Sequence, residues 1–302
     1  MDGAVVLDKP RGMTSHDAVV IVRRMLAEPR VGHLGTLDPL ATGVLVLLLG
    51  TATRLAQFYG NREKEYEGVI RFGFSTDTFD GTGRPTSAQQ AVALGEPQLR
   101  SLFQEFLGTR LQQPPPFSAK KVSGVPAYRL ARKGRSAPLK AVPVTIHELR
   151  LLSVEGDLAQ FRARVSAGTY IRSLAHELGQ RLGTGAHLAE LRRTAVGEFT
   201  LAQAVSLEQL QEQVHHETSW LIPLAELLPE IPAVALSNST AEAASHGNDV
   251  QLDAEAPWIK LLDGAGRLLA IAERRKENWY HPLVVLSARP VKNGMVGNNA
   301  AL

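Results

Sequence analysis

The segment from Gly32 to Gly50 constrains the fold of this 302-residue chain more than any other part of the sequence. It ends in a continuous apolar run, Val44 to Leu49, which is closed by a glycine and is typical of a fully buried strand. Residues 32–43 read Gly-His-Leu-Gly-Thr-Leu-Asp-Pro-Leu-Ala-Thr-Gly and contain a single carboxylate, Asp38. Because glycine permits tight turns and close approach of another backbone, we expect a tight loop that leads into a core strand.

Asp38 is held on stiff main chain, because the proline that follows it excludes the helical region for the preceding residue. Alone, an Asp-Pro pair also suits an ordinary turn. In a site without metal or cofactor, such a carboxylate acts as a general base or as a nucleophile. Either role needs the ionised form, so we expect a cation nearby. Arg172, in the first turn of a predicted helix, is the candidate, although alone it also suits a surface position.

Several classes of site are missing from the sequence. The chain contains no cysteine, which excludes disulfides, thiolate catalysis and cysteine-ligated metal centres. It also lacks His-Glu-x-x-His, Gly-x-Gly-x-x-Gly at a strand end, a P-loop and a Gly-x-Ser-x-Gly elbow. We therefore expect no metal and no cofactor. The N-terminus does not resemble a signal peptide and no apolar run is long enough to span a bilayer, so we expect a cytoplasmic protein without membrane association.

One segment accounts for the net positive charge of the chain. Between Phe106 and His147 the sequence has eight basic residues and no acidic one. All 30 acidic residues therefore lie elsewhere, and the rest of the chain is net negative. A confined positive segment favours a polyanionic partner, and the interleaved Phe117 and Tyr128 offer stacking surfaces for unpaired bases. We expect RNA as the partner; the alternative is a basic loop exposed to solvent.

The periodicity of apolar residues predicts an α/β (α+β) fold. Helical spacing predicts helices in five places: 15–25, 51–59, 99–106, 169–183 and 188–192. Extended patterns predict strands over 4–7, 44–49 and 64–72, and a hairpin of 142–154 with 158–165. The many proline and glycine residues between 110 and 140 predict an irregular insertion that reaches out from the core.

The composition changes beyond Trp220. Pro223, Pro229 and Pro232 predict a linker, and the short apolar runs that follow predict a small β domain. We therefore expect three parts. They are a first domain over 1–220 with the basic insertion at about 110–140, a β-rich domain over 221–288, and a disordered tail over 289–302.

Five segments match one known family in the expected order. They are Leu7-Asp-Lys-Pro-Arg-Gly-Met-Thr-Ser15, Val31-Gly-His-Leu-Gly-Thr-Leu-Asp-Pro-Leu-Ala-Thr-Gly-Val-Leu45, Lys64-Glu-Tyr66, Gly168-Thr-Tyr-Ile-Arg172 and Gly185-Ala-His-Leu-Ala-Glu-Leu-Arg-Arg193. Over about residues 4–200 the chain thus resembles the TruB family of tRNA pseudouridine synthases. More loosely, the C-terminal part resembles the PUA-like RNA-binding module of these enzymes.

The resemblance implies a fold and a reaction. The fold is a mixed, largely antiparallel sheet flanked by helices, followed by the small PUA-like β domain. The reaction isomerises a uridine flipped from the T loop of tRNA, at position 55 in tRNA numbering, to pseudouridine. It needs no cofactor, and Asp38 is its nucleophile. Whether Asp38 attacks the base or the sugar stays open.

The resemblance also implies roles for residues that have plainer explanations on their own. Tyr66 stacks on the flipped base and helps in proton transfer, although alone it suits a core strand. Tyr170 and Leu191 contact the uridine, and Arg172 pairs with the nucleophile. His33 helps to hold the opened T loop, although alone it suits a structural histidine.

The remaining family residues concern support and RNA binding. Lys9 and Pro10 match a motif that supports the catalytic loop. By resemblance, the basic insertion clasps the T stem-loop, and we expect Lys120, Lys121 and Arg132 to contact phosphates.

Three alternatives stay open at this point. One is the guide-RNA-dependent branch of the same family, which works within a protein complex; the second is an RNA chaperone without chemistry. The third is a retaining glycosidase, which would need a second acidic residue and a neutral sugar groove. We expect a monomeric, stand-alone enzyme with no obligate protein partner.

Overall fold

The computed structural model describes residues 1–118, 120–122, 124–127, 139–216 and 218–286. The chain forms two compact units. The larger unit consists of Val5–Leu48 and Ala56–Trp220, and the smaller one of Met1–Ala4, Leu49–Leu55 and Leu221–Leu302. The sequence prediction had placed both N-terminal pieces of the smaller unit in the first domain. The predicted tail over 289–302 lies outside the described residues.

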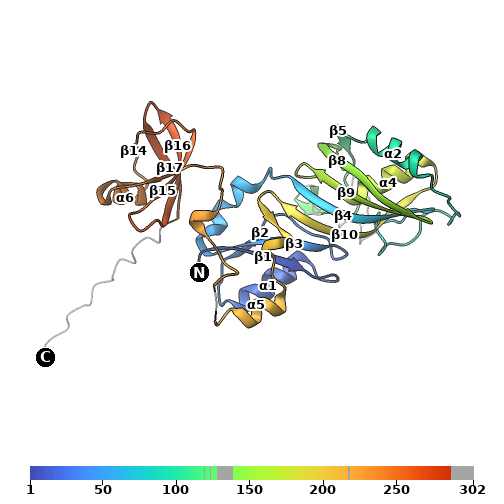
Figure 1. The fold of residues 1–302 in the computed structure, drawn as a ribbon, viewed down its shortest axis with the longest axis horizontal. Coiled ribbons are helices and arrows are strands. Elements are labelled where there is room, and N and C mark those ends of the chain that lie inside the picture. Colours follow the sequence, from blue (N-terminus) through green and yellow to red (C-terminus); the bar gives the residue numbers. More distant parts are fainter. Residues whose placement is uncertain (119, 123, 128–138, 217, 287–302) are drawn as a thin grey trace. The chain divides into compact units, whose positions relative to one another are not determined.

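A twisted sheet forms the body of the larger unit (Figure 1). Its strands follow the order β1-β3-β10-β4-β9-β8-β5, with β2 beside β3 and β11 beside β10. Their bounds are β1 (Gly3–Lys9), β2 (Val31–His33), β3 (Thr42–Leu49), β4 (Lys64–Phe72), β5 (Gly108–Gln112), β8 (Val142–Glu155), β9 (Leu158–Val165), β10 (Ala186–Val196) and β11 (Phe199–Thr200). The pair β3–β10 is parallel, whereas β10–β4, β4–β9, β9–β8 and β8–β5 are antiparallel. The predicted mixed, largely antiparallel sheet is confirmed.

Helices flank this sheet. Helix α1 packs against β2, α2 packs against β8, and α4 packs against β10, and Figure 1 shows α2 and α4 near the β8 end of the sheet. The helices of the larger unit are α1 (Ser15–Met25), α2 (Glu96–Glu105), α4 (Ile171–Leu182) and α5 (Leu207–Gln213), with the 3-10 turn η2 (Leu201–Gln203). The 3-10 helix η1 (Gly50–Tyr59) connects pieces of the two units.

Local sequence signals explain the ends of α1 and α4. Thr14 caps α1 through a capping box with Asp17, whose carboxylate accepts from the Thr14 backbone N–H at 3.0 Å. Helix α4 ends at Gly183, which has a left-handed backbone with φ of 72°. Both helices were predicted from their apolar spacing.

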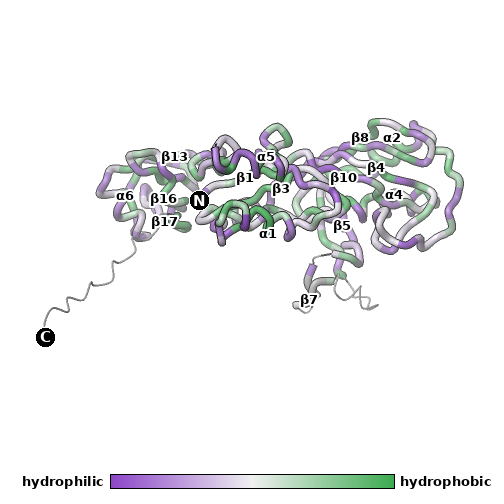
Figure 2. The backbone as a smooth tube through the Cα atoms, turned by 90° about the horizontal axis from the view of Figure 1, so that it is seen from below, coloured by the Kyte–Doolittle hydropathy of each residue, from purple (hydrophilic) through white to green (hydrophobic). Residues whose placement is uncertain are grey.

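Strand β3 is the buried centre of the larger unit. Residues from Val44 to Leu49 are almost completely buried, and Figure 2 shows β3 as a hydrophobic stretch. The hairpin β8–β9 closes through the predicted turn and pairs Glu155 with Leu158. The buried strand and the hairpin were both predicted from the sequence.

The helix predicted over 188–192 is wrong, because these residues belong to strand β10. A β-bulge lies between Leu188 and Glu190, where the register with β4 shifts. The extra residue brings Leu188 and Leu191, three positions apart, to the same face of the sheet. A bulged strand therefore imitates the i, i+3 spacing of a helix.

The smaller unit contains a five-stranded sheet of order β13-β15-β16-β17-β14. Its elements are η3 (Leu224–Glu226), β13 (Ala233–Ala235), α6 (Asn238–Ser245), β14 (Val250–Gln251), β15 (Trp258–Leu262), β16 (Leu268–Lys276) and β17 (Trp279–Val285). Strand β12 (Ile222–Pro223) pairs with Gly3 and Ala4. The hydroxyl of buried Tyr280 donates to the carbonyls of Ala254 and Ala256, both at 2.9 Å. The predicted β-rich C-terminal part is confirmed.

Among the described residues, no helix is both long and apolar enough to cross a membrane.

Candidate active site

The loop that carries Asp38 connects β2 to β3 and is fixed from both sides. The backbone N–H of Leu37 donates to Ser15 Oγ at 2.8 Å, and this hydroxyl donates back to the Leu37 carbonyl at 3.1 Å. The N–H of Gly12 donates to the carbonyl of Pro39 at 2.7 Å. The segment from Leu7 to Ser15 therefore supports the loop through the backbone of Gly12 and the side chain of Ser15.

A buried arginine holds the same loop from the sheet. Arg193 on β10 is 1% exposed, and its Nε donates to the carbonyl of Val44 at 2.7 Å. Its terminal nitrogens donate to the carbonyls of Gly35, at 3.0 Å, and Thr36, at 3.4 Å. The guanidinium therefore ties the start of β3 to the residues just before Asp38.

The structure brings Asp38 and Arg172 together. Arg172 Nε lies 2.8 Å from Asp38 Oδ2 and the Nη2 of the same guanidinium lies 3.0 Å from Oδ1, which makes the pair bidentate. The Arg172 side chain is 6% exposed, whereas that of Asp38 is 37% exposed. This two-point, charge-assisted contact fixes the carboxylate and leaves part of it open to a reactant.

Arg172 has further partners that fix its orientation. It donates to the carbonyls of Thr78, at 3.0 Å, and Phe117, at 2.9 Å. The buried carboxylate of Asp80 lies 3.7 Å from its Nη1. Asp80 is in turn held by the backbone N–H of Thr82, which donates to its Oδ1 at 3.0 Å. Arg172 therefore lies between two carboxylates and two carbonyls.

The Asp38 carboxylate faces a cavity of about 320 Å3. The polar side chains that line this cavity include Asp38, Lys64, Tyr66, Ser118, Tyr170, Arg172 and Arg193, and its apolar wall includes Leu37, Ile171 and Leu191. The predicted residues Asp38, Tyr66, Tyr170, Arg172 and Leu191 thus share one cavity. Its volume lies in the range of ligand pockets, about 300–1,000 Å3.

The sheet sets the positions of Tyr66 and Leu191. Tyr66 on β4 is paired with Arg193, and Leu191 is paired with Gly68 two positions along the ladder. Residues two apart on a strand point to the same face, so Tyr66 and Leu191 both face the cavity. A Cβ at Gly68 would lie only 2.6 Å from the carbonyl of Glu190. Glycine there allows the close approach of β4 and β10.

Tyr170 caps α4, and a glutamine side chain fixes its backbone. The Tyr170 N–H donates to Gln112 Oε1 at 2.8 Å, and Gln112 Nε2 donates back to the Tyr170 carbonyl at 3.1 Å. Burial raises the pKa of the Tyr170 phenol, so the phenol is protonated at neutral pH. The Gln112 side chain is completely buried, and it orients the first turn of the helix that carries Arg172.

The predicted residues Lys9, Pro10 and His33 do not line the cavity. Burial lowers the pKa of Lys9 to about 8, an effect that the charge of Asp38 opposes. Its ammonium donates to the carbonyls of Pro10 and Met13, both at 2.8 Å. His33 on β2 is partly buried, and burial lowers its pKa, so the ring is neutral at pH 7.

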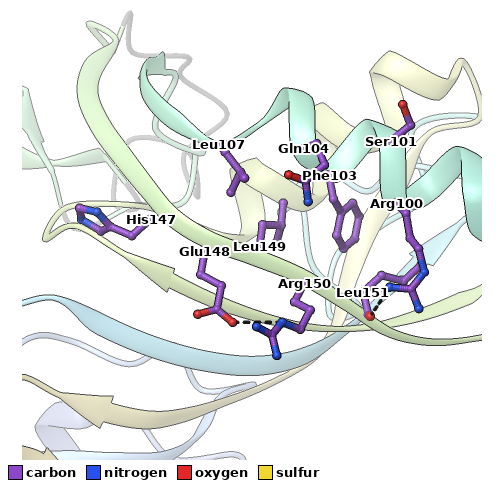
Figure 3. A pocket seen from close by; sticks show the side chains of 10 residues that line it. All are labelled: Arg100, Ser101, Phe103, Gln104, Leu107, His147, Glu148, Leu149, Arg150 and Leu151. Carbon is purple, nitrogen blue, oxygen red and sulfur yellow. Dashed lines mark hydrogen bonds and ion pairs between the residues drawn. The ribbon is translucent and has the colours of Figure 1, made fainter.

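A second cavity of the larger unit, of about 410 Å3, lies between α2 and β8 (Figure 3). Its charged side chains all have partners: Arg150 lies 3.4 Å from Glu148, Arg100 lies 2.6 Å from Glu96, and His147 lies 3.2 Å from Glu63. No carboxylate there is held by a buried cation. The cavity at Asp38 is therefore the better candidate for an active site.

The comparisons with known proteins identify the family of the chain. Residues 23–171 match the family model described as "TruB family pseudouridylate synthase (N terminal domain)". Residues 172–229 match the "tRNA pseudouridylate synthase B C-terminal domain". A protein named tRNA pseudouridine synthase B from Solibacter usitatus is 48% identical over 95% of this chain and 100% of its own. A protein of the same name from Bacillus cytotoxicus is 40% identical over 97% of this chain and 97% of its own.

This chain belongs to the TruB family of pseudouridylate synthases. Solved structures of the same fold include one titled "Crystal Structure of a Cbf5-Nop10-Gar1 Complex". Its matched chain is 26% identical, with a TM-score of 0.72 over 94% of this chain and 85% of that one. A second, titled as an H/ACA RNP bound to a substrate RNA containing 2'-deoxyuridine, is 25% identical with a TM-score of 0.71 and covers 95% and 86%. The predicted pseudouridine synthase fold is confirmed.

Sequence reasoning missed four residues of this TruB-family site: Lys64, Asp80, Gln112 and Arg193. Asp80 belongs to an Asp-Gly-Thr-Gly run, whose residue types are typical of turns. Lys64 and Arg193 lie within segments that carried the family resemblance, which was the available signal. No sequence pattern marks Gln112, because its partner Tyr170 is 58 positions away.

The basic insertion is described only in part. Lys120 is partly buried and donates to the carbonyl of Lys140 at 3.1 Å. Lys121 belongs to β6 (Lys121–Val122), which pairs with β7 (Val125–Pro126), but its side chain is not among the described ones. Arg132 lies outside the described residues. Figure 2 shows the β7 region projecting beyond β5.

Within the described parts of the chain, no three His, Asp or Glu side chains converge on a point that would hold a metal ion.

Proposed function

We propose that this protein is a tRNA pseudouridine synthase that converts the T-loop uridine at position 55 to pseudouridine. The observation that carries the proposal is the bidentate pair of Arg172 with Asp38 at the wall of a cavity. The names of the curated relatives, tRNA pseudouridine synthase B, supply the substrate class.

In this proposal Asp38 is the nucleophile. The glycosidic C–N bond of uridine breaks, the uracil turns over, and a C–C bond forms to its C5 while the C5 proton is lost. The reaction is an isomerisation without net oxidation or reduction, so the protein supplies only a nucleophile, proton transfers and a shaped cavity. Arg172 pairs with both oxygens of Asp38 and fixes the direction in which they point.

The other cavity residues bind the flipped uridine. Tyr66 stacks on the base and takes part in proton transfer, and Tyr170 and Leu191 contact the nucleotide. Flipping a base out of its stack requires a few kcal/mol, less where the base already lies in a loop. His33, neutral at pH 7, holds the opened T loop from outside the cavity.

We further propose that the basic insertion at about 110–140 clasps the T stem-loop. Lys120, Lys121 and Arg132 would contact phosphates there. Residues 1–220 form the catalytic domain in this proposal, residues 221–288 a PUA-like RNA-binding domain, and residues 289–302 a tail. Lys9 and Pro10 support the Asp38 loop indirectly: the Lys9 ammonium fixes the turn from Pro10 to Met13, and Gly12 in this turn donates to the carbonyl of Pro39.

The enzyme acts alone, as a cytoplasmic monomer on free tRNA. The guide-RNA-dependent branch is the second candidate, because the Cbf5 structure shares the fold over most of the chain. Identities of 40–48% to proteins named tRNA pseudouridine synthase B favour the stand-alone enzyme. Purified protein incubated with bare tRNA separates the two: pseudouridine at position 55 is expected, and its absence would contradict the stand-alone proposal.

The decisive variant is Asp38→Asn, which keeps the shape of the side chain and removes its charge. We expect it to abolish tritium release from RNA labelled at uridine C5 and to leave tRNA affinity nearly unchanged. Asp157→Asn is the matched control, because Asp157 is 32% exposed and pairs with Arg71 at 2.9 Å, but does not line the cavity. Turnover by Asp38→Asn equal to that of Asp157→Asn would refute the assignment and favour an RNA chaperone.

A further inference from the structure

The Asp38 cavity contains more positive charge than its carboxylate balances. The described residues that line it include three cations, Lys64, Arg172 and Arg193, and one carboxylate, Asp38. Arg172 is neutralised by Asp38 and Asp80. No ion pair links Lys64 or Arg193 to a carboxylate in the described part of the chain. Within these described residues, the charges of Lys64 and Arg193 are therefore uncompensated.

The two cations differ in how firmly they are held. Arg193 donates to three backbone carbonyls, once from each guanidinium nitrogen, so it is fixed in place as a buried charge. Lys64 donates to one carbonyl, that of Arg62, at 2.7 Å. An ammonium has three donors, so Lys64 retains donors for a ligand.

The position of Lys64 places this donor beside the loop of the nucleophile. Lys64 begins β4, two positions before Tyr66 on the same face of the strand. A Cβ at Gly35 would lie 3.4 Å from Lys64 Cε, in ordinary contact. Gly35 has φ of +87°, a left-handed backbone that favours glycine. The loop therefore passes close to the lysine stem, and the ammonium borders the cavity.

Desolvation of the ammonium makes an anionic ligand favourable. Burial, reinforced by the charge of Arg193, lowers the pKa of Lys64 to about 8. The side chain therefore remains mostly protonated at neutral pH although its surroundings disfavour the charge. An anion that enters the cavity relieves this cost and makes a charge-assisted hydrogen bond.

We propose that Lys64 and Arg193 form an anion subsite of the cavity, in which Lys64 binds a phosphodiester group that flanks the target uridine. Uracil and ribose are neutral, so the phosphates are the only anions that an RNA substrate brings into the cavity. The subsite holds the flipped nucleotide by its backbone, whereas Tyr66 and Leu191 hold its base. This inference rests on the proposed function.

The test compares three T stem-loop RNAs by equilibrium binding. One has natural phosphodiesters, and the others carry a single neutral methylphosphonate on the 5′ or the 3′ side of the target uridine. We expect wild-type protein to bind one of the two modified RNAs about tenfold more weakly, the usual loss for one charged hydrogen bond. The affected RNA identifies which phosphate occupies the subsite.

Lys64→Met should bind natural RNA about tenfold more weakly and should lose no further affinity for the affected methylphosphonate RNA. Lys64→Arg keeps a cation and should discriminate the RNAs as wild type does. Arg181→Met is the matched control, since the Arg181 side chain is 65% exposed and does not line the cavity. It should keep the full discrimination.

Equal affinity of wild type for all three RNAs would overturn the proposal, and this result does not depend on whether Lys64→Met folds. Undiminished discrimination by a folded Lys64→Met would overturn it too. Because the readout is binding, it is separate from the proposed activity, which fails if wild-type protein forms no pseudouridine in tRNA.

Discussion

Two cavities of the larger unit are similar in volume, about 320 Å3 at Asp38 and about 410 Å3 between α2 and β8, but they organise charge in opposite ways. At Asp38 the cations Arg172 and Arg193 are almost completely buried and bonded on several sides. In the second cavity Arg150 is 68% exposed and Arg100 is 52% exposed (Figure 3).

This difference shows which cavity is organised for chemistry. An exposed ion pair contributes about 0–1 kcal/mol and is replaced by water with little loss. A buried ion needs several partners in fixed positions, because removing one partner leaves an uncompensated charge. Of these two cavities, the one at Asp38 is therefore the one whose charges are fixed in position.

The strongest test of the comparison replaces one arginine in each cavity. Arg172→Lys keeps the charge but loses the bidentate geometry, so we expect kcat to fall about 100-fold while tRNA affinity changes little. Arg150→Lys in the second cavity should leave kcat unchanged. Single-turnover kinetics and binding of both variants check this, and an unchanged rate in Arg172→Lys would remove Arg172 from the catalytic group.

A second test concerns the other carboxylate on Arg172. Asp80→Asn keeps the acceptor for the Thr82 N–H but removes the charge that lies 3.7 Å from the guanidinium. We expect kcat to fall about tenfold, because Arg172 loses one of its restraints, with little change in RNA affinity. Glu148→Gln is the control, since it removes the carboxylate beside Arg150. Equal rates in the two variants would show that the charge of Asp80 is not needed to orient Arg172.

The sequence predicts a residue of this site when its role follows from its neighbours along the chain or from the chemistry of the site, and not when the role depends on the fold. Asp38 was found through its own proline and glycines, and Arg172 through the need of a desolvated carboxylate for a cation, although the two are 134 positions apart. Asp80 and Gln112 were missed because their roles depend on which backbone groups the fold brings beside them. Their side chains look ordinary in the sequence.

The fold follows the same rule. The buried strand β3 and the hairpin β8–β9 depend on patterns within a few residues, and both were predicted. Strand β10 was mistaken for a helix because its bulge appears only in the register with β4. Propensity and spacing describe a segment alone, whereas a bulge is a property of a strand pair.

A third test uses pH to separate Lys64 from the other charged groups of the cavity. With a pKa of about 8, Lys64 is protonated at pH 7 and loses its charge as the pH rises through about 8. RNA affinity should therefore fall about fivefold between about pH 7 and pH 9.5, with a midpoint shifted upward by the bound phosphate.

Lys64→Arg is the control for the pH test, because a guanidinium stays charged throughout this range. Asp38, Tyr66, Arg172 and Arg193, which share the cavity, are the same in both proteins, as is Lys9, whose pKa is also lowered to about 8. The difference between the two pH profiles thus reports Lys64. Identical profiles would assign the loss of affinity to another group.

The smallest expected effect belongs to the second cavity. The double variant Glu148→Gln, Arg150→Met removes a whole ion pair of 3.4 Å whose arginine is mostly exposed. The free energy of unfolding should change by no more than about 0.5 kcal/mol, and kcat and KM for tRNA should stay those of wild type. Denaturant unfolding and steady-state kinetics measure both. If this variant weakens tRNA binding, the cavity between α2 and β8 belongs to the RNA-binding surface, and its solvated charges are there for the substrate rather than for solubility.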